Sequence, residues 1–346
     1  MNLHGDLVDL FTEIVDIESV SGNEKPLADS IQFALEPLAH LSVERFEDTV
    51  LARTELGRAE RVVVAGHLDT VPVKGNLPHR REGDRIYGRG TCDMKGGVAV
   101  ALQAAAQLTS PSRDVTWIFY DHEEVDAALN SLSHIDPAKL AGDLAILMEP
   151  TAALIEGGCQ GHLRFQITTK GIAAHSARSW RGHNAIHDMF DVLARLYRYQ
   201  PREVEVEGLT YREGLNAVRI WGGIASNVIP DACTIEINHR FAPDHLLPEA
   251  QDYCRELFIG YDLDFVDGAN GARPGLDTKI AQEFVSAVGG TPRPKFGWTD
   301  VARFSALGIP AINFGPGDPF KAHADDEYCD ISDLHTCHQA LLNFLQ

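Results

Sequence analysis

Hydrophobic residues follow two different patterns along this chain. In residues 1–160, and again after about residue 272, short apolar runs such as Val62–Ala65 alternate with helical segments. Residues 7–17 have apolar side chains at helical spacing and predict the first helix, and a second helix is predicted from Glu24 to about His40. Apolar runs of this kind are typical of strands buried on both faces of a parallel sheet. These two parts therefore predict one α/β domain.

The middle of the chain alternates apolar and polar residues instead. Alternation is clear at Leu163–Thr169, around Glu205 and at Thr234–Phe241, and it predicts half-exposed antiparallel strands. Two helices are expected among them, at about Ala185–Tyr199 and Pro248–Phe258. We predict an α+β domain at residues 161–271, with an antiparallel sheet and two helices. It would be inserted into a discontinuous α/β domain made of residues 1–160 and 272–346.

The composition limits the classes of molecule that this protein could bind. The chain has 346 residues, a formal net charge of −20 and a pI near 5.1. Such an acidic protein is unsuited to nucleic acid or to anionic membranes, which need a basic surface. No run approaches the roughly 20 apolar residues of a membrane span. Residues 1–8 lack a basic region followed by an apolar run, so we expect no secretory signal.

Six cysteines are scattered along the chain without any C-x-x-C pair. This spacing favours reduced thiols in the cytoplasm over a disulfide framework or a zinc–thiolate site. Any metal must therefore be held by histidines and carboxylates.

Polar residues follow the first strongly predicted strand. His67 and Asp69 come directly after the run Val62–Ala65 and Gly66, at the carboxyl end where open α/β sheets bind ligands. His67 could ligate a metal through one ring nitrogen while Asp69 orients it. A plain strand-end histidine is the alternative.

Further polar residues follow other predicted strands or their turns. Asp93 ends a glycine-rich turn, Glu123 and Glu124 follow one strand, Glu149 follows the next, and His323 follows a later one. Each has an ordinary alternative, such as a helix cap, a solvated acidic loop, a turn or a surface histidine. Together with His67, however, they gather on one side of the predicted sheet. Two histidines with several carboxylates make the ligand set for a pair of divalent ions bridged by a carboxylate.

Motifs around these residues resemble the di-zinc aminoacylase/carboxypeptidase family of metallohydrolases, over nearly the whole chain. They are G-H-L-D-T-V-P at Gly66–Pro72, Y-G-R-G-T-C-D-M-K-G-G at Tyr87–Gly97, the E-E pair, M-E-P, and A-H-x-x-D-E at Ala322–Glu327. A second set resembles the actinobacterial branch of that family, the succinyl-diaminopimelate desuccinylases. These segments are Gly158–His162, Ala173–Trp180, Gly182–His187, Leu209–Val218 and Ser226–Asp231.

The resemblance implies a phosphorylase/hydrolase-like catalytic domain and an inserted lid or dimerisation domain. It also implies two zinc ions per subunit, which cobalt can replace. His67 and Glu149 would bind one ion, Glu124 and His323 the other, and Asp93 would bridge both.

Catalytic roles also follow from the resemblance. Asp69 would support His67, Glu123 would act as the general base, and a cis peptide bond would follow Asp93. The implied reaction is hydrolysis of the amide bond of N-succinyl-LL-2,6-diaminopimelate. The alternatives are an acetylornithine deacetylase or another N-acyl-amino-acid hydrolase and, from a different class, a non-catalytic metal-binding relative.

Four residues of the inserted segment are candidates for substrate binding. His175 resembles the family histidine that reaches into the partner subunit's active site, which implies a homodimer. Asn227 and Arg240 match positions that contact substrate. Arg178 is a candidate second cationic anchor, because the implied substrate carries three carboxylates. Without the resemblance, His175 would be a loop histidine and Arg240 a surface arginine.

Overall fold

The computed structural model describes all 346 residues, and they form two compact units. The first unit contains residues 1–158, 274–294 and 299–346, and the second contains residues 159–273 and 295–298. The separate catalytic and lid roles expected for the two parts of the chain stay predictions.

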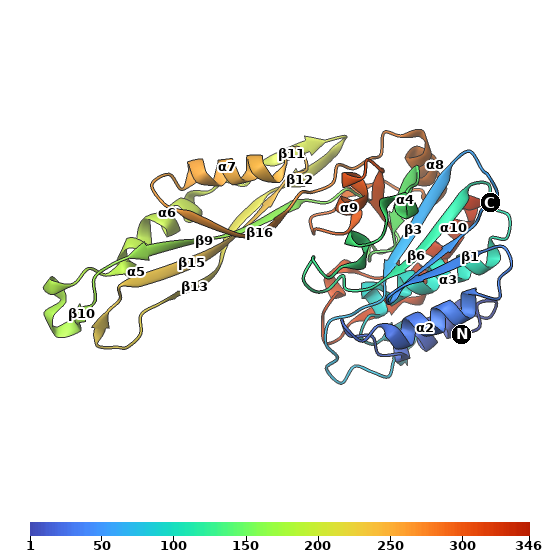
Figure 1. Ribbon diagram of the computed structural model, residues 1–346, viewed down its shortest axis with the longest axis horizontal. Coiled ribbons are helices and arrows are strands. Elements are labelled where there is room, and N and C mark those ends of the chain that lie inside the picture. The colour runs from blue at the N-terminus through green and yellow to red at the C-terminus, as the bar shows by residue number, and fades with distance from the viewer. The chain divides into compact units, whose positions relative to one another are not determined.

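An eight-stranded sheet forms the centre of the first unit, in the order β1-β2-β6-β3-β7-β18-β8-β17 (Figure 1). Strand β3 (Arg61–His67) lies between β6 (Asp114–Tyr120) and β7 (Leu144–Leu147) and is parallel to both. β18 (Ala311–Asn313) continues the parallel part beside β7. Almost every residue of these strands is buried, as their apolar runs predict. The mainly parallel sheet confirms the predicted α/β class.

The other strands of the first unit lie at the edges of this sheet or in a small sheet of their own. At the edges are β1 (Ser42–Phe46), β2 (Thr49–Arg53), β8 (Glu156–Gly157) and β17 (Arg293–Pro294); the small antiparallel sheet holds β4 (Arg80–Glu82), β5 (Arg85–Tyr87) and β19 (Tyr328–Asp330).

Helix α3 (Gly96–Gln107) is buried over nearly its whole length and packs against β3 and β6. A Cβ added at Gly97 would lie 2.2 Å from the carbonyl oxygen of Met148. The first turn of α3 can therefore approach the end of β7 only because residue 97 is glycine.

Helix α2 (Lys25–Leu35) ends earlier than the predicted His40, because Pro37 has no amide hydrogen to continue the helical bonds. The other helices of this unit are α1 (Leu7–Asp16), α4 (Pro137–Leu140), α8 (Lys279–Val288), α9 (Val301–Ala306) and α10 (Ile331–Leu345), with short helical turns η1 (Thr91–Lys95), η2 (Ser131–Ser133) and η4 (Pro319–Lys321).

A four-stranded antiparallel sheet forms the second unit, in the order β13-β15-β9-β16. Its central strands, β9 (Gly161–Lys170) and β15 (Ala232–Phe241), have ten residues each. Along β9 the side chains alternate between buried and more exposed, as the sequence pattern predicts. Helices cover one face of the sheet (Figure 1).

The helix predicted at residues 185–199 is broken, because the amide of Met189 donates to the carbonyl of Ile186, three residues back, in a tightened turn. The remaining elements of the second unit are α5 (Ala185–Asp188), α6 (Phe190–Arg198), α7 (Leu247–Leu257), η3 (Ser176–Arg181), β10 (Ala174–His175), β11 (Glu203–Val206), β12 (Leu209–Arg212), β13 (Gly214–Gly222), β14 (Val228–Ile229) and β16 (Leu263–Ala269).

Two sequence-based expectations concern the whole chain. All six cysteines are free and buried, so the structure contains no disulfide. None of the helices combines the length and the apolar character that a membrane crossing requires.

Candidate metal centre

His67 is the last residue of β3 and is buried. Its Nδ1 lies 2.9 Å from the carbonyl oxygen of Asp69, and its Nε2 lies 3.1 Å from Oδ1 of Asp93. A neutral imidazole has one N–H, and here Nδ1 carries it to donate to the carbonyl. Nε2 then points a lone pair at a carboxylate oxygen. Two acceptors this close require a cation or a second proton between them.

Asp93 lies in the kinked turn η1, and the peptide bond that follows it is cis, as the resemblance implies. Its two oxygens point to different histidines. Oδ1 faces His67, and Oδ2 lies 3.3 Å from Nε2 of His323. This is the contact pattern required of a carboxylate that bridges two metal ions.

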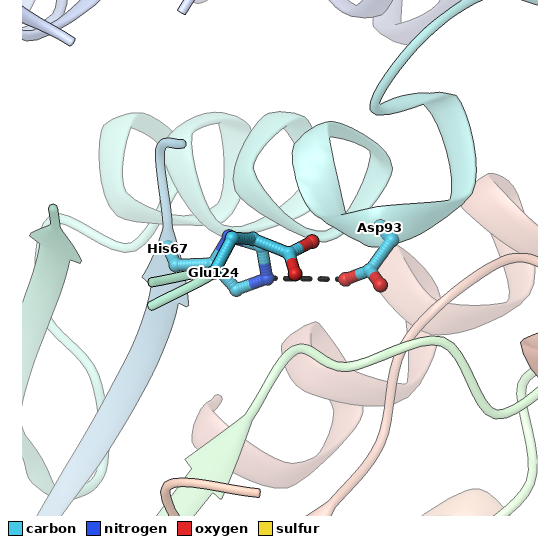
Figure 2. A group of neighbouring side chains, drawn as sticks. All are labelled: His67, Asp93 and Glu124. Atoms are coloured by element: carbon cyan, nitrogen blue, oxygen red, sulfur yellow. Dashed lines mark hydrogen bonds and ion pairs between the residues drawn. The ribbon is translucent and has the colours of Figure 1, made fainter. Parts of the chain in front are cut away.

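Glu124 completes a compact group of ligand atoms. Its Oε1 lies 2.9 Å from Nε2 of His323, which occupies a left-handed backbone conformation (φ 64°) in the loop after β18. One potential ligand atom from each of His67, Asp93 and Glu124 lies within 4.8 Å of the others (Figure 2). The structure therefore brings together residues from three separate segments of the first unit.

Glu123 and Glu149 lie beside this group. Burial raises the pKa of Glu123 well above its usual value; the charge of His67 opposes the shift, and the charges of Asp300, Glu149 and Glu124 add to it. Glu149 is itself buried, just beyond the end of β7. It is near enough to Glu123 to act on it electrostatically, although it lies outside the group of three in Figure 2.

The electrostatics of the group suit a cation. Burial alone would lower the pKa of His67, but hydrogen bonds with Asp69 and Asp93 raise it well above its usual value. Hydrogen bonds with Asp93 and Glu124 raise the pKa of His323 to about 10. A proton on each histidine, or a bound cation, offsets the negative charge of Asp93 and Glu124. Histidine nitrogens and carboxylate oxygens are also the ligands that zinc prefers, so the residues present fit divalent ions.

Asp69 supports more than His67. It is fully buried; Oδ1 accepts the backbone N–H of Glu123, and Oδ2 accepts that of Glu124, both at 2.9 Å. Oδ2 also accepts the hydroxyl of Ser21 at 2.7 Å. The sequence predicted that Asp69 supports His67, but not that it accepts the backbone N–H groups of Glu123 and Glu124.

Sequence reasoning missed a second set of buried charges near the group. Arg89 and Glu327 form a buried ion pair, and the ammonium group of Lys95 donates to the carbonyl of Ile17 at 2.6 Å. All three lie within the motifs Y-G-R-G-T-C-D-M-K-G-G and A-H-x-x-D-E. The density of charged residues in these motifs was the available signal.

The four predicted substrate residues lie in the second unit, in two places. His175 (β10) pairs with β14, next to Asn227, and Arg178 lies exposed in η3. Strands β9 and β15 end nearby, at Lys170 and Ala232, whereas Arg240 lies at the opposite end of β15. At roughly 3.3 Å per residue, the length of β15 separates Arg240 from the first three by about 25 Å.

A comparison with family models identifies the chain. Residues 63–346 match the model of peptidase family M20/M25/M40. The chain belongs to this family. Its members are metal-dependent hydrolases, and the group of His67, Asp93 and Glu124 is the candidate metal site of this one.

Relatives of known name cover the full length of the chain. It is 49% identical over 351 residues to the DapE protein of Mycobacterium tuberculosis, an alignment that covers 100% of this chain and 99% of the relative. It is 47% identical over 359 residues to succinyl-diaminopimelate desuccinylase of Corynebacterium glutamicum, covering 100% and 97%.

Solved structures confirm the fold. A tripeptidase from Staphylococcus aureus superposes with a TM-score of 0.82 at 19% identity, covering 98% of this chain and 96% of that one. A metallo-carboxypeptidase from Sulfolobus solfataricus gives a TM-score of 0.76 at 18% identity, covering 98% of both chains.

Proposed function

We propose that this chain hydrolyses the amide bond of N-succinyl-LL-2,6-diaminopimelate to succinate and LL-2,6-diaminopimelate, with two zinc ions per subunit that cobalt can replace. The observation that carries the reaction type is Asp93, whose two oxygens point to two different histidines. The observation that favours the substrate is full-length similarity to relatives whose names include succinyl-diaminopimelate desuccinylase.

The proposed ligands divide between two ions. His67 and Glu149 would hold one, Glu124 and His323 would hold the other, and Asp93 would contribute to both. When bound, such ions polarise the amide carbonyl and lower the pKa of water toward neutrality. Asp69 keeps the proton of His67 on Nδ1, which leaves Nε2 free to bind.

Glu123 is the proposed general base. Its raised pKa, caused by burial and by the neighbouring carboxylates, gives it a strong affinity for a proton. It can therefore take the proton from the attacking water and return it to the leaving amine. The hydrogen bond from its backbone N–H to Asp69 fixes the position of the segment that carries it.

Arg240 and Arg178 are the proposed anchors for the carboxylates of the substrate, and Asn227 is a further contact. His175 would donate to the oxyanion. Arg178 and Asn227 lie beside His175, about 25 Å from Arg240 at the other end of β15, so one second unit cannot bring all four residues to one substrate, and Arg178 and Asn227 would come from the same subunit as His175. We therefore propose a homodimer in which His175 serves the partner's site.

Exposed apolar residues of the second unit support a dimer. β13 is an edge strand, with Ile220 and Trp221 about half exposed. Phe190 and Tyr197 of the neighbouring helix α6 are 75% and 91% exposed. An apolar edge strand of this length is a ready surface for a second copy of the chain. The free cysteines favour the cytoplasm as the location.

A panel of substrates tests the proposed activity. Zinc-loaded protein is assayed with N-succinyl-LL-2,6-diaminopimelate, N-acetylornithine and other N-acetyl amino acids. We expect the highest kcat/KM for the succinyl substrate. A higher value for an N-acetyl substrate would favour the deacetylase alternative, and zinc binding without hydrolysis would favour a non-catalytic relative.

Mixed dimers test the proposed role of His175. His175→Ala and Glu123→Gln homodimers should both be inactive. Dimers with one subunit of each kind should recover activity, because one site then receives both an intact Glu123 and an intact partner His175. Mixed dimers without recovered activity would rule out a contribution in trans.

A further inference from the structure

The ion pair between Arg89 and Glu327 is an unusual feature of the first unit. Nη1 of Arg89 lies 2.8 Å from Oε2 of Glu327, and the two side chains are only 3% and 1% exposed. They are 238 residues apart in the sequence. Burying two charges is costly unless their geometry and remaining contacts are well satisfied. The proposed reaction uses neither residue.

The other oxygen of Glu327 holds the turn that carries Asp93. Oε1 accepts the backbone N–H of Cys92 at 2.9 Å and that of Asp93 itself at 3.2 Å. Glu327 also lies only four residues after His323 in the motif A-H-x-x-D-E. One carboxylate thus ties the backbone of one proposed ligand to the segment of another.

Arg89 joins a third segment to these two. Its Nη1 also donates to the carbonyl of Ala324, next to His323, at 3.3 Å, and its Nε donates to the carbonyl of Pro72 at 3.2 Å. Pro72 ends the G-H-L-D-T-V-P motif that contains His67. The planar guanidinium presents its N–H groups in a fixed fork, so it sets directions as well as distances.

We propose that Arg89 and Glu327 act as a clamp that fixes Asp93 relative to His67 and His323 and so sets the affinity of the centre for zinc. This inference rests on the proposed function, because it assumes that these three residues bind metal. Both residues of the clamp are positioning residues. Both oxygens of Glu327 are already used by donors, and the pair adds no net charge to the acidic centre.

The test is the dissociation constant for Zn²⁺, measured in wild type and in Glu327→Gln by competition with a chelator of known affinity. The amide of glutamine cannot accept from all the donors that Glu327 holds. Loss of a residue that orients metal ligands typically weakens metal binding roughly 10- to 100-fold, and we expect a change of that size. Excess zinc should then restore kcat with KM for the substrate unchanged.

Asp114→Asn is the matched control. Asp114 is also buried in the first unit, and it likewise accepts two backbone N–H groups, from Leu56 and Arg58, both at 2.8 Å. It also lies 3.8 Å from Arg61. However, it opens β6, roughly 20 Å from the end of that strand where the ligands gather. Asp114→Asn should lower the melting temperature and leave zinc affinity unchanged.

The outcomes are distinct. If wild type binds no zinc, the proposed metal centre fails. If wild type binds zinc and Glu327→Gln binds it equally well, the clamp is overturned and the centre stands. If Glu327→Gln does not fold, Arg89→Lys is measured in the same way, because it keeps the charge and loses the fork. Weaker zinc binding in Arg89→Lys would support the clamp, and wild-type affinity would overturn it.

Discussion

Asp69→Asn tests how the candidate metal centre is held together. The Asp69 carboxylate accepts the N–H groups of Glu123 and Glu124 and the hydroxyl of Ser21. Asparagine replaces one oxygen by an NH₂ group. In either orientation that NH₂ faces a backbone N–H, so a hydrogen bond becomes a contact between two donors.

The size of the effect follows from the pKa of Asp69. Burial alone would raise this pKa, but the contact with His67, whose Nδ1 lies 3.5 Å from Oδ1 of Asp69, and the hydrogen bonds from Ser21 and Glu124 lower it from 3.8 to about 2. A shift of this size corresponds to about 2 kcal/mol of folding free energy. Because the folded-state pKa is the lower one, this stabilisation is complete above about pH 4 and is lost as the pH falls toward 2.

The assay is urea denaturation of chelator-treated protein, wild type against Asp69→Asn. At neutral pH we expect the variant's free energy of unfolding to be lower by about 2 kcal/mol, with the difference shrinking below about pH 4. Equal stability at neutral pH would refute the assigned hydrogen bonds. A difference that stays the same down to about pH 2 would refute the ionised carboxylate as its source.

Three further changes have defined outcomes. Glu123→Gln should bind zinc as wild type does and lose roughly 10²- to 10⁴-fold in kcat, measured by steady-state kinetics; near-normal turnover would remove it as the base. Gly97→Ala should lower the melting temperature, because its Cβ would meet the carbonyl of Met148 at 2.2 Å, and an unchanged melting temperature would contradict that packing. Burial lowers the pKa of His239 from 6.5 to about 4, so stability should fall as the pH drops through this range. The melting temperature of His239→Gln should fall less over this range than that of wild type, and a fall of the same size in the variant would exclude His239 as a cause.

The location of the candidate site could be predicted because a simple rule connects sequence to space. Parallel strands end at the same edge of a sheet, so polar residues that follow apolar runs must gather there. His67, Glu124 and His323 follow β3, β6 and β18 and do so, whereas Asp93 reaches the same place from the turn η1 before α3, which follows no strand of this sheet. The alternation of apolar and polar residues along β9 and β15 likewise predicted antiparallel strands, and the two strands pair in this way in the second unit.

Other features could not be predicted because their cause lies in tertiary packing. Arginine, lysine and glutamate are usually exposed, so the burial of Arg89, Lys95 and Glu327 becomes visible only in the folded chain. Burial lowers the pKa of Lys95 to about 7, although its ammonium group donates to two backbone carbonyls. The helix break at Met189 depends on the hydrogen bond from its amide to the carbonyl of Ile186, which helical periodicity does not reveal. Periodicity identifies which face of a helix or strand is buried. It does not identify the hydrogen-bonding and ion-pair partners of a buried charged residue, because these come from segments far apart in the sequence.

The most direct test of the metal centre is the zinc content of the protein after purification in excess zinc. Metal analysis should find two zinc ions per chain in wild type. It should find fewer in Asp93→Asn, since the amide nitrogen cannot replace the second bridging oxygen. The same two zinc ions in Asp93→Asn, or less than one in wild type, would contradict a centre bridged by Asp93.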